Sequence, residues 1–349
     1  MLDAMSTWSG ETLHVRFDHP TATWMLVAIH HARRGSAGGG TRMKRYPSVD
    51  AAVADALALA EAMTYKWTLA GIPIGGAKAV LAVPDGLDAG ARSDLLRRYG
   101  TFVASLRGSF RTGPDVGTSP EDMDVIAETG GEHVSSRASQ GVEGGSTAPT
   151  AVGVLAGIRA AVAHVLEEPS LAGRTIAIQG LGGVGSRLAT ALGAAGARVV
   201  ACDVDASAAR RAAEGGRIEI VEPAAIYDVP CDVFAPCALG GVLNGDTIPR
   251  LRCRIVAGAA NNQLAELDDA RRLRERGITY APDYAVNAGG VIGVVGVESY
   301  GWSEEQARLE VEGRITGTLR EIFGLAERDG IDTETAARRL ARQRLSEEG

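Results

Sequence analysis

A glycine pattern at residues 180–185 constrains the fold of this chain more than any other feature of its sequence. The segment Gly180-Leu181-Gly182-Gly183-Val184-Gly185 matches GxGxxG and stands directly after an apolar, strand-like run and directly before a helical one. Glycines there permit a tight turn and let a pyrophosphate reach the helix N-terminus, where free N–H groups stabilise negative charge. Asp203 ends the next apolar run, about 20 residues on, where a carboxylate can hydrogen-bond ribose hydroxyls and repel a 2′-phosphate. The pattern therefore predicts a βαβ unit that binds NAD.

Short apolar runs alternate with helical stretches from about residue 147 to 300, which is typical of a parallel sheet. Before them, strand-like runs are mixed with helices, and the Ser- and Gly-rich segment 135–149 is typical of a hinge. We therefore expect an α/β fold of two domains with a cleft between them. An α/β substrate and oligomerisation domain would span 1–146, a doubly wound Rossmann-type NAD domain 147–325, and a C-terminal helix 326–349 that caps the second domain or packs back on the first.

Composition narrows the range of partners. The net charge of −7, with no basic stripe, argues against nucleic acid as a partner. The N-terminal residues lack the basic and apolar regions of a signal peptide, and we see no apolar run long enough to span a membrane, so we expect a cytoplasmic protein. The four cysteines, Cys202, Cys231, Cys237 and Cys253, stand in apolar segments without metal-ligand spacing, which predicts reduced thiols and no metal. A small metabolite is the expected partner.

Three segments of the first domain carry a more specific signal: GGGTRM at 38–43, MTYKWTLAGIPIGGAK at 63–78 and TGPDVGTSPEDMD at 112–124. They resemble the glutamate, leucine, phenylalanine and valine dehydrogenase family, and the resemblance continues through APCALGGVLN, AGAANNQL and YAPDYAVNAGGVI, which ends at residue 292. It covers the chain from about residue 38 to 300. The resemblance implies an NAD-dependent oxidoreductase that interconverts an L-amino acid with its 2-oxo acid and ammonia, assembled as a homo-oligomer.

The proposed reaction has three chemical requirements. Oxidising an amino acid at Cα needs a cation for the carboxylate, a base, and an activated water to attack the imine. Two lysines in one pocket suit these needs, because mutual repulsion and desolvation lower a lysine pKa. By resemblance, Lys66 binds the substrate carboxylate, Lys78 is the low-pKa base that activates water, and Asp115 carries protons to and from the substrate nitrogen. The family pattern has Gly-Gly-Gly-Lys before the base where this chain has Gly75-Gly76-Ala77-Lys78, and we expect the extra methyl group to shift the loop slightly.

Further positions are assigned by resemblance alone. The Asn-Asn and Asn-Ala-Gly-Gly segments among them are equally typical of loops and helix caps. The substrate-binding positions are Gly38, Gly39, Gly40, Met63, Gly113, Pro114, Asn262, Val291 and Val294. The cofactor-binding positions are Thr150, Gly180, Leu181, Gly182, Gly183, Val184, Gly185, Asp203, Val204, Cys237, Ala238, Ala259, Ala260, Asn261 and Asn287.

The predicted side-chain pocket contains no charged residue, which argues against glutamate as the substrate. Leucine and valine enzymes of the family tend to carry Leu at the position of Gly38 and Ala at that of Gly113. Glycine at both positions would widen the pocket and favours an aromatic, phenylalanine-like substrate. Val291 and Val294 are typical of branched-chain enzymes, so a leucine or valine dehydrogenase of the same mechanism is the alternative, and broad specificity is compatible with both.

An alternative of another class is a non-catalytic NAD-binding regulatory protein that has kept the fold. Lys66, Lys78 and Asp115 together argue against it, because a scaffold without chemistry has no need for two lysines and an acid in one pocket.

Overall fold

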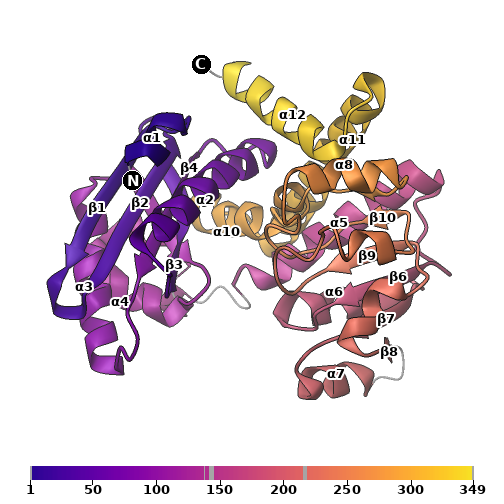
Figure 1. The fold of residues 1–349 in the computed structure, drawn as a ribbon, viewed down its shortest axis with the longest axis horizontal. Helices are drawn as coiled ribbons and strands as arrows, with labels where there is room; N and C mark the ends of the chain where they lie inside the picture. The colour runs from indigo at the N-terminus through magenta and orange to yellow at the C-terminus, as the bar shows by residue number, and fades with distance from the viewer. Residues whose placement is uncertain (1, 137, 141–144, 215–217, 348–349) are drawn as a thin grey trace. The chain divides into compact units, whose positions relative to one another are not determined.

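A computed structural model describes residues 2–136, 138–140, 145–214 and 218–347 of the chain (Figure 1). The chain forms two compact units, Met1–Glu143 and Gly144–Gly349. The predicted hinge at 135–149 lies partly outside the described residues, at 137 and 141–144.

The first unit is built on a five-stranded sheet with the order β1-β2-β4-β3-β5. The first pair is an antiparallel hairpin, β2 also runs antiparallel to β4, and β3 pairs in parallel with β4 and β5. Its central strand, β4, is therefore paired on both sides. The strands are β1 (Thr12–Asp18), β2 (Thr23–His31), β3 (Ala37–Lys44), β4 (Gly75–Ala82) and β5 (Phe110–Pro114).

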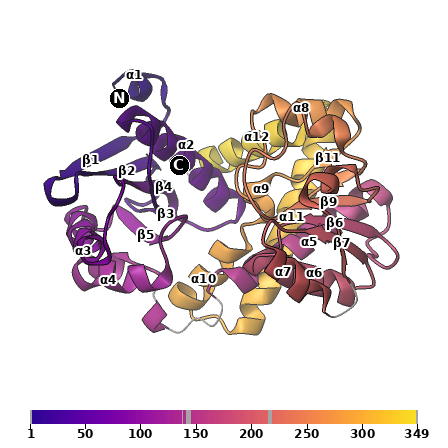
Figure 2. The same ribbon diagram turned by 60° about the horizontal axis from the view of Figure 1, so that its bottom comes forward.

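Helices cover both faces of this sheet, as the two views show (Figure 2). The helix α2 (Val49–Leu69) packs on one face, against side chains such as Leu26 and Val80. The helices α3 (Ala89–Ser105) and α4 (Pro120–Gly130) pack on the other, against Ala77 and Ala79. A short helix, α1 (Leu2–Thr7), precedes the sheet. Because side chains alternate along a strand, Lys78 projects from β4 on the face that carries α2.

The alternation also locates the extra methyl group of Ala77. Its side chain is fully buried in the apolar cluster beneath α3 and α4, on the face of the sheet opposite to Lys78. The methyl group therefore adds to the core and does not enter the surroundings of the lysine.

The second unit contains a six-stranded sheet with the order β11-β10-β9-β6-β7-β8, in which every pairing is parallel. The sheet is wound outward in both directions from β6 and β9, which confirms the predicted doubly wound α/β fold. The strands are β6 (Thr175–Gln179), β7 (Arg198–Cys202), β8 (Ile218–Ile220), β9 (Val233–Pro236), β10 (Ile255–Val256) and β11 (Thr279–Tyr280). The helices are α5 (Thr147–Leu166), α6 (Gly183–Ala194), α7 (Ala206–Ala213), α8 (Asp268–Glu275), α9 (Asp283–Val286), α10 (Gly289–Tyr300), α11 (Glu304–Asp329) and α12 (Thr333–Glu347).

Helix α5 corrects one expectation from the sequence. It is long and apolar enough to cross a membrane, with a mean hydropathy of 1.5, although we saw no such run in the sequence. Half of that window is buried, and α5 packs against α6, α10 and α11. Side chains such as Val154 and Ile158 are fully buried there, so α5 is a core helix of the second unit.

The C-terminal helices contact their own unit. Gly330 ends α11 in the left-handed conformation, with φ of 65°, and α12 then packs against α11 and β11. Glu334 of α12 is buried and accepts hydrogen bonds from the Tyr284 hydroxyl at 3.1 Å and from Arg338 Nε at 2.7 Å. Burial raises the pKa of Glu334 to about 7, against the opposing effect of Arg338.

This raised pKa predicts a pH-dependent stability. A carboxyl group with a higher pKa in the folded state contributes its full stability below its unfolded pKa, and the contribution is lost as pH rises through the folded pKa. As pH rises from 4.5 to 8, the unfolding free energy of the native chain should fall by up to ~3 kcal/mol relative to that of Glu334→Gln, which has no carboxyl group to ionise. Urea unfolding at four pH values would measure it, with the exposed Glu321→Gln as control. A difference that does not vary with pH would contradict the burial argument.

Candidate active site

The buried pair of Lys78 and Asp115 is the centre of the site in the first unit. Lys78 is 5% exposed in the middle of β4, and Asp115 follows directly after β5. Lys78 Nζ lies 3.0 Å from Asp115 Oδ1. The Asp115 backbone N–H donates to Thr118 Oγ1 at 2.9 Å, and that hydroxyl contacts Thr41 O at 2.8 Å, which ties the turn after β5 to β3. Two residues assigned from separate sequence motifs are thus brought into contact by the sheet.

The surroundings tune both groups in the direction that acid–base chemistry needs. Burial lowers the pKa of Lys78 below its ordinary value, Asp115 opposes this effect, and the nearby Arg42 guanidinium adds to it. Burial alone would raise the pKa of Asp115, but Lys78 and Arg42 together hold it below its ordinary value. A lysine that loses its proton easily therefore stands beside a carboxylate that is ionised before the reaction begins.

Arg42 belongs to the site of Lys78 and Asp115 but was not predicted from the sequence. It lies within the GGGTRM segment, where we assigned only the glycines. Arg42 Nε donates to Asp115 Oδ2 at 2.8 Å, and its Nη1 lies 3.2 Å from Asp55 Oδ2 on α2. The sequence did contain a signal for Arg42. It stands two residues from Gly40 on one strand, so both residues lie on the same face of the sheet.

Lys66 lies in the last turn of α2, where it is half-buried. That turn is held close to β4, because a Cβ on Gly76 would lie only 2.1 Å from Thr64 N. The contact brings the turn that carries Lys66 against the strand that carries Lys78.

Of the 36 lysine and arginine residues in the chain only three are lysines, and Lys44 is the third.

The glycines of β3 are required by close packing. A Cβ on Gly39 would lie 1.7 Å from Ala77 O, and one on Gly40 would lie 2.7 Å from Pro114 O. The predicted pocket residues Met63 and Gly113 are half-buried in the same unit. These contacts explain why the segments 38–40, 75–78 and 112–115 can approach one another.

Neighbouring side chains occupy the space beside the two glycines that we expected to widen the pocket. A Cβ on Gly38 would lie 3.3 Å from Trp67 Cζ2 and 3.2 Å from Ile74 Cγ2. Trp67 is 6% exposed, and its Nε1–H donates to Gly38 O at 2.8 Å. A Cβ on Gly113 would likewise lie 3.2 Å from Ser135 Oγ. Glycine at these positions therefore leaves less open space than the sequence suggested.

The glycine pattern of the second unit forms the turn that its spacing predicted. Gly180 has φ of 101°, and a Cβ on Gly185 would lie 2.0 Å from Gly180 O, so α6 begins tightly against the end of β6. A Cβ on Gly182 would meet nothing within 4 Å, which leaves this part of the turn open. The Leu181 N–H donates to Asp203 Oδ2 at 2.6 Å. The predicted turn and its acidic residue are therefore in direct contact.

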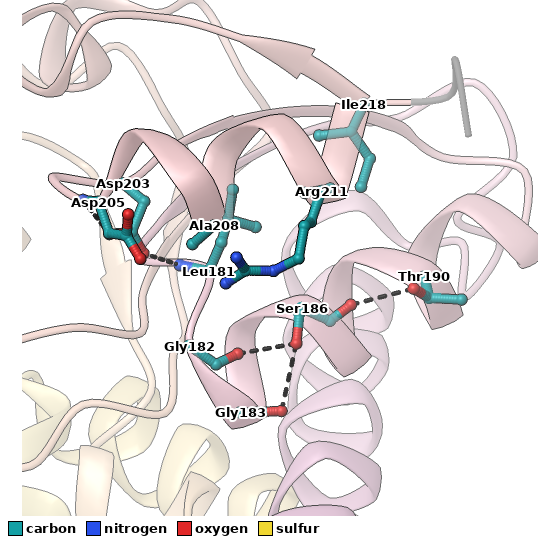
Figure 3. A pocket seen from close by; sticks show the side chains of 11 residues that line it. Leu181, Gly182, Gly183, Ser186, Thr190, Asp203, Asp205, Ala208, Arg211 and Ile218 are labelled. Atoms are coloured by element: carbon teal, nitrogen blue, oxygen red, sulfur yellow. Dashed lines mark hydrogen bonds between the residues drawn. The ribbon is translucent and has the colours of Figure 1, made fainter. Parts of the chain in front are cut away.

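A cavity of about 710 Å³ lies beside this turn (Figure 3). Figure 3 shows the side chain of Arg211, which we did not predict, extending from α7 toward the turn. Val204, by contrast, is 91% exposed and does not line the cavity. The cavity fits an adenosine diphosphate group by its size, by the open turn at a helix N-terminus and by the carboxylate at the end of the next strand. The lining residues are Leu181, Gly182, Gly183, Ser186, Thr190, Asp203, Asp205, Ala208, Arg211, Ala212 and Ile218.

Several of the other predicted cofactor residues also lie together. Asn287 Nδ2 donates to Ala259 O at 3.1 Å and to Asn261 Oδ1 at 2.7 Å. Cys237 and Ala238 flank the glycine turn, because a Cβ on Gly180 would lie 2.7 Å from Ala238 Cβ. The segments 237–238 and 259–261 follow the carboxyl ends of β9 and β10, which is where ligands bind to sheets of this type.

Asn262 has a backbone conformation that its neighbours maintain. Its φ is 52°, in the left-handed region, and the buried Gln263 anchors the segment by donating its N–H to Asp283 Oδ2 at 2.9 Å.

The Thr150 hydroxyl donates to Ser146 O at 2.6 Å. Val291 and Val294 are one turn apart on α10, half-buried and buried respectively. These four predicted residues belong to the second unit.

Comparisons with known proteins give family matches in both units. A family model described as "Glu/Leu/Phe/Val dehydrogenase, dimerisation domain" matches residues 21–131, and one described as "Glutamate/Leucine/Phenylalanine/Valine dehydrogenase" matches residues 204–348. The chain is 40% identical to a leucine dehydrogenase of Thermoactinomyces intermedius, covering 99% of this chain and 93% of the relative. It is 42% identical to a valine dehydrogenase of Streptomyces coelicolor, with 95% and 90% covered.

A third similarity is to an L-tryptophan dehydrogenase of Nostoc punctiforme, 43% identical over 92% of this chain and 89% of the relative. The crystal structure of L-tryptophan dehydrogenase from that organism matches with a TM-score of 0.85 and 38% identity, covering 100% of this chain and 99% of that one.

Proposed function

Because the chain belongs to the glutamate/leucine/phenylalanine/valine dehydrogenase family, we propose that it reversibly deaminates a branched-chain aliphatic L-amino acid to its 2-oxo acid and ammonia, with NAD as the cofactor. The observation that carries the proposal is the buried contact of 3.0 Å between Lys78 Nζ and Asp115 Oδ1. A depressed lysine pKa beside an ionised carboxylate is the arrangement that proton transfer at an amino group and activation of water require.

Each side chain has a separate part in the proposed mechanism. Lys66, with the backbone of Gly39 and Gly40, binds the substrate carboxylate. Asp115 accepts a proton from the substrate ammonium group and returns one to the departing amine. Neutral Lys78 takes a proton from the water that attacks the imine carbon and passes it to solvent. It then accepts the hydroxyl proton when the tetrahedral intermediate expels ammonia and forms the 2-oxo acid. The nicotinamide supplies the hydride acceptor when it is bound.

The residues around the glycine turn support NAD over NADP. Asp203 and Asp205 both line the cavity, and two carboxylates there would repel a 2′-phosphate. Asp203 Oδ1 also accepts the Asp205 N–H at 2.8 Å, which holds its carboxylate in place. Arg211 is the only cation among the described residues that line the cavity, and its Nη1 already donates to Ser207 Oγ at 3.0 Å.

The substrate proposal favours an aliphatic side chain, which was the alternative in the sequence analysis. Leucine and valine dehydrogenases are among the relatives, and Trp67 and Ile74 fill the space beside Gly38 that an aromatic ring was expected to use. An aromatic substrate is the second candidate, because the similarity to L-tryptophan dehydrogenase extends over 92% of the chain.

Initial rates of NADH formation with Leu, Val, Ile, Phe, Trp, Tyr and Glu would test the proposal, with NADP as a parallel cofactor. We expect the highest kcat/KM with Leu or Val. In Trp67→Leu the filled space opens, and the kcat/KM ratio of Phe to Leu should rise at least ~10-fold. Trp67→Phe, which keeps most of the volume, is the matched control.

The outcomes separate the competing functions. Preference of the native chain for Phe or Trp would replace the aliphatic proposal with the aromatic one. An unchanged ratio in Trp67→Leu would remove Trp67 as a determinant of substrate size. Absence of turnover with every amino acid, while NAD still binds, would favour the non-catalytic NAD-binding protein.

We also infer how the chain assembles. The match of residues 21–131 to a dimerisation domain supports a homo-oligomer assembled through the first unit. We also propose a cytoplasmic location, where free NAD and amino acids are both present.

A further inference from the structure

Asp115 is shared between two cations, one at each oxygen. Lys78 Nζ lies 3.0 Å from Oδ1, and Arg42 Nε lies 2.8 Å from Oδ2. The side chains of Lys78, Arg42 and Asp115 are 6%, 11% and 14% exposed, so water screens these charges poorly. Nothing in the proposed reaction requires the second cation to contact the substrate.

The second cation solves a difficulty in the proposed chemistry. To act as a base, Lys78 must lose its proton. If Lys78 were the only partner of Asp115, this loss would leave a buried carboxylate unpaired, at a cost large enough to retain the proton. A guanidinium group keeps its charge at every accessible pH, so Arg42 remains paired with Asp115 when Lys78 is neutral.

Asp55 of α2 holds Arg42 in place from the other side. Arg42 Nη1 lies 3.3 Å from Asp55 Oδ1 and 3.2 Å from Oδ2. The Tyr46 hydroxyl donates to Asp55 Oδ2 at 2.5 Å, and Lys44 Nζ lies 3.7 Å from the same oxygen. Lys44 also lies over the Tyr46 ring, 4.6 Å from its centroid. Asp55 is therefore contacted by two side chains of β3, Arg42 and Lys44, and by Tyr46, which follows that strand.

The charges of these side chains balance only when Lys78 is neutral. The cations are Arg42 and Lys44 on β3 and Lys78 on β4, and the anions are Asp115 after β5 and Asp55 on α2. With Lys78 protonated the five carry one net positive charge, and with Lys78 neutral they carry none. Lys66, in the last turn of α2, adds a further positive charge on this helix. Arg42 therefore favours release of the Lys78 proton, in the same direction as burial, while Asp115 and Asp55 oppose it.

We propose that Arg42, oriented by Asp55, is a positioning residue that keeps Asp115 ionised and paired while Lys78 loses its proton, without itself contacting the substrate. The consequence for catalysis depends on the proposed function, whereas the effect on the Lys78 proton does not. The two charges of the network act in opposite directions. Arg42 repels the Lys78 ammonium and gives Asp115 a second partner, whereas Asp55 neutralises part of the charge on Arg42.

The small number of lysines makes a direct titration possible. With ¹³C-labelled lysine the chain gives Cε signals from only three side chains, which Lys44→Arg, Lys66→Arg and Lys78→Arg would assign. We expect Arg42→Met to raise the titration midpoint of Lys78 by at least ~1 pH unit, and Asp55→Asn to lower it. The acidic limb of kcat/KM should move in the same two directions, while KM for the amino acid changes less than threefold. Arg42→Lys keeps the charge, and its midpoint should lie between those of the native chain and Arg42→Met.

Opposite shifts distinguish this proposal from a merely structural role, because a loosened site would move the midpoint toward the ordinary lysine value in both variants. Shifts in the same direction, or an unmoved midpoint in Arg42→Met, would overturn it. Circular dichroism and the unfolding temperature of each variant check the fold, and Asp55→Asn, which is close to isosteric, keeps the test open if Arg42→Met does not fold. A native chain without turnover would refute the proposed function, while the NMR titration would still decide the proposal on Arg42.

Discussion

Replacing Lys78 by methionine is expected to lower kcat by about 10²- to 10⁴-fold, the usual contribution of a general base. Methionine has nearly the length of lysine but cannot accept a proton. Asp115 would keep Arg42 as a partner at 2.8 Å, so the sheet should remain folded. The glycine turn belongs to the other unit, so NAD should bind with unchanged affinity. Stopped-flow and steady-state rates with the preferred amino acid, together with calorimetric titration of NAD, would measure both effects.

Lys78→Arg is the matched variant that separates charge from proton transfer. Arginine restores the cation beside Asp115 but cannot be deprotonated in a protein, so this variant should be as inactive as the methionine one. If Lys78→Arg kept most of the native rate, the residue would act only as a charge, and its assignment as the base would be wrong.

Replacing Gly76 by alanine is expected to cost about 3 kcal/mol of unfolding free energy and to lower kcat/KM about 100-fold. The new Cβ would lie 2.1 Å from both Thr64 N and Thr64 Oγ1, so the end of α2 must move away from β4. This movement would displace Lys66 from the strand that carries Lys78. Thermal unfolding would measure the stability, and initial rates would measure the activity.

Gly90→Ala provides the control for this prediction. Gly90 lies in the first turn of α3, in the same unit, and its new Cβ would meet only Asp88 Oδ1, at 3.3 Å. Its stability and activity should stay close to native. If Gly76→Ala behaved like this control, the close packing of α2 on β4 would not be what aligns the two lysines.

Short sequence patterns correctly predicted the features that depend on neighbouring segments of the chain. The turn at Gly180–Gly185 and the position of Asp203 depend on a strand, a turn and a helix that follow one another directly in the chain. The doubly wound sheet could be predicted for the same reason, because each βαβ unit repeats one short pattern.

The features that the sequence did not predict depend on contacts between distant segments. Arg42 and Asp55 meet only because α2 covers the face of β3 that carries Arg42. Similarly, the sequence around Gly38 suggested open space, because nothing local indicated that the indole of Trp67 would fold back onto it. Substrate preference depends on such contacts, which is why the substrate class was harder to predict than the family.

Strand β4 places the reactive amine and the apolar core on alternate residues of one central strand. Its pairing aligns Lys78 with Ala28 of β2 and Ala79 with Thr41 of β3. A slip by a single residue would turn the ammonium group into the apolar core beneath α3 and α4 and put an alanine in its place under α2. A chain that pairs this strand out of register would therefore bury an unpaired ammonium group. This free-energy cost should keep stable but inactive sheets from accumulating during folding.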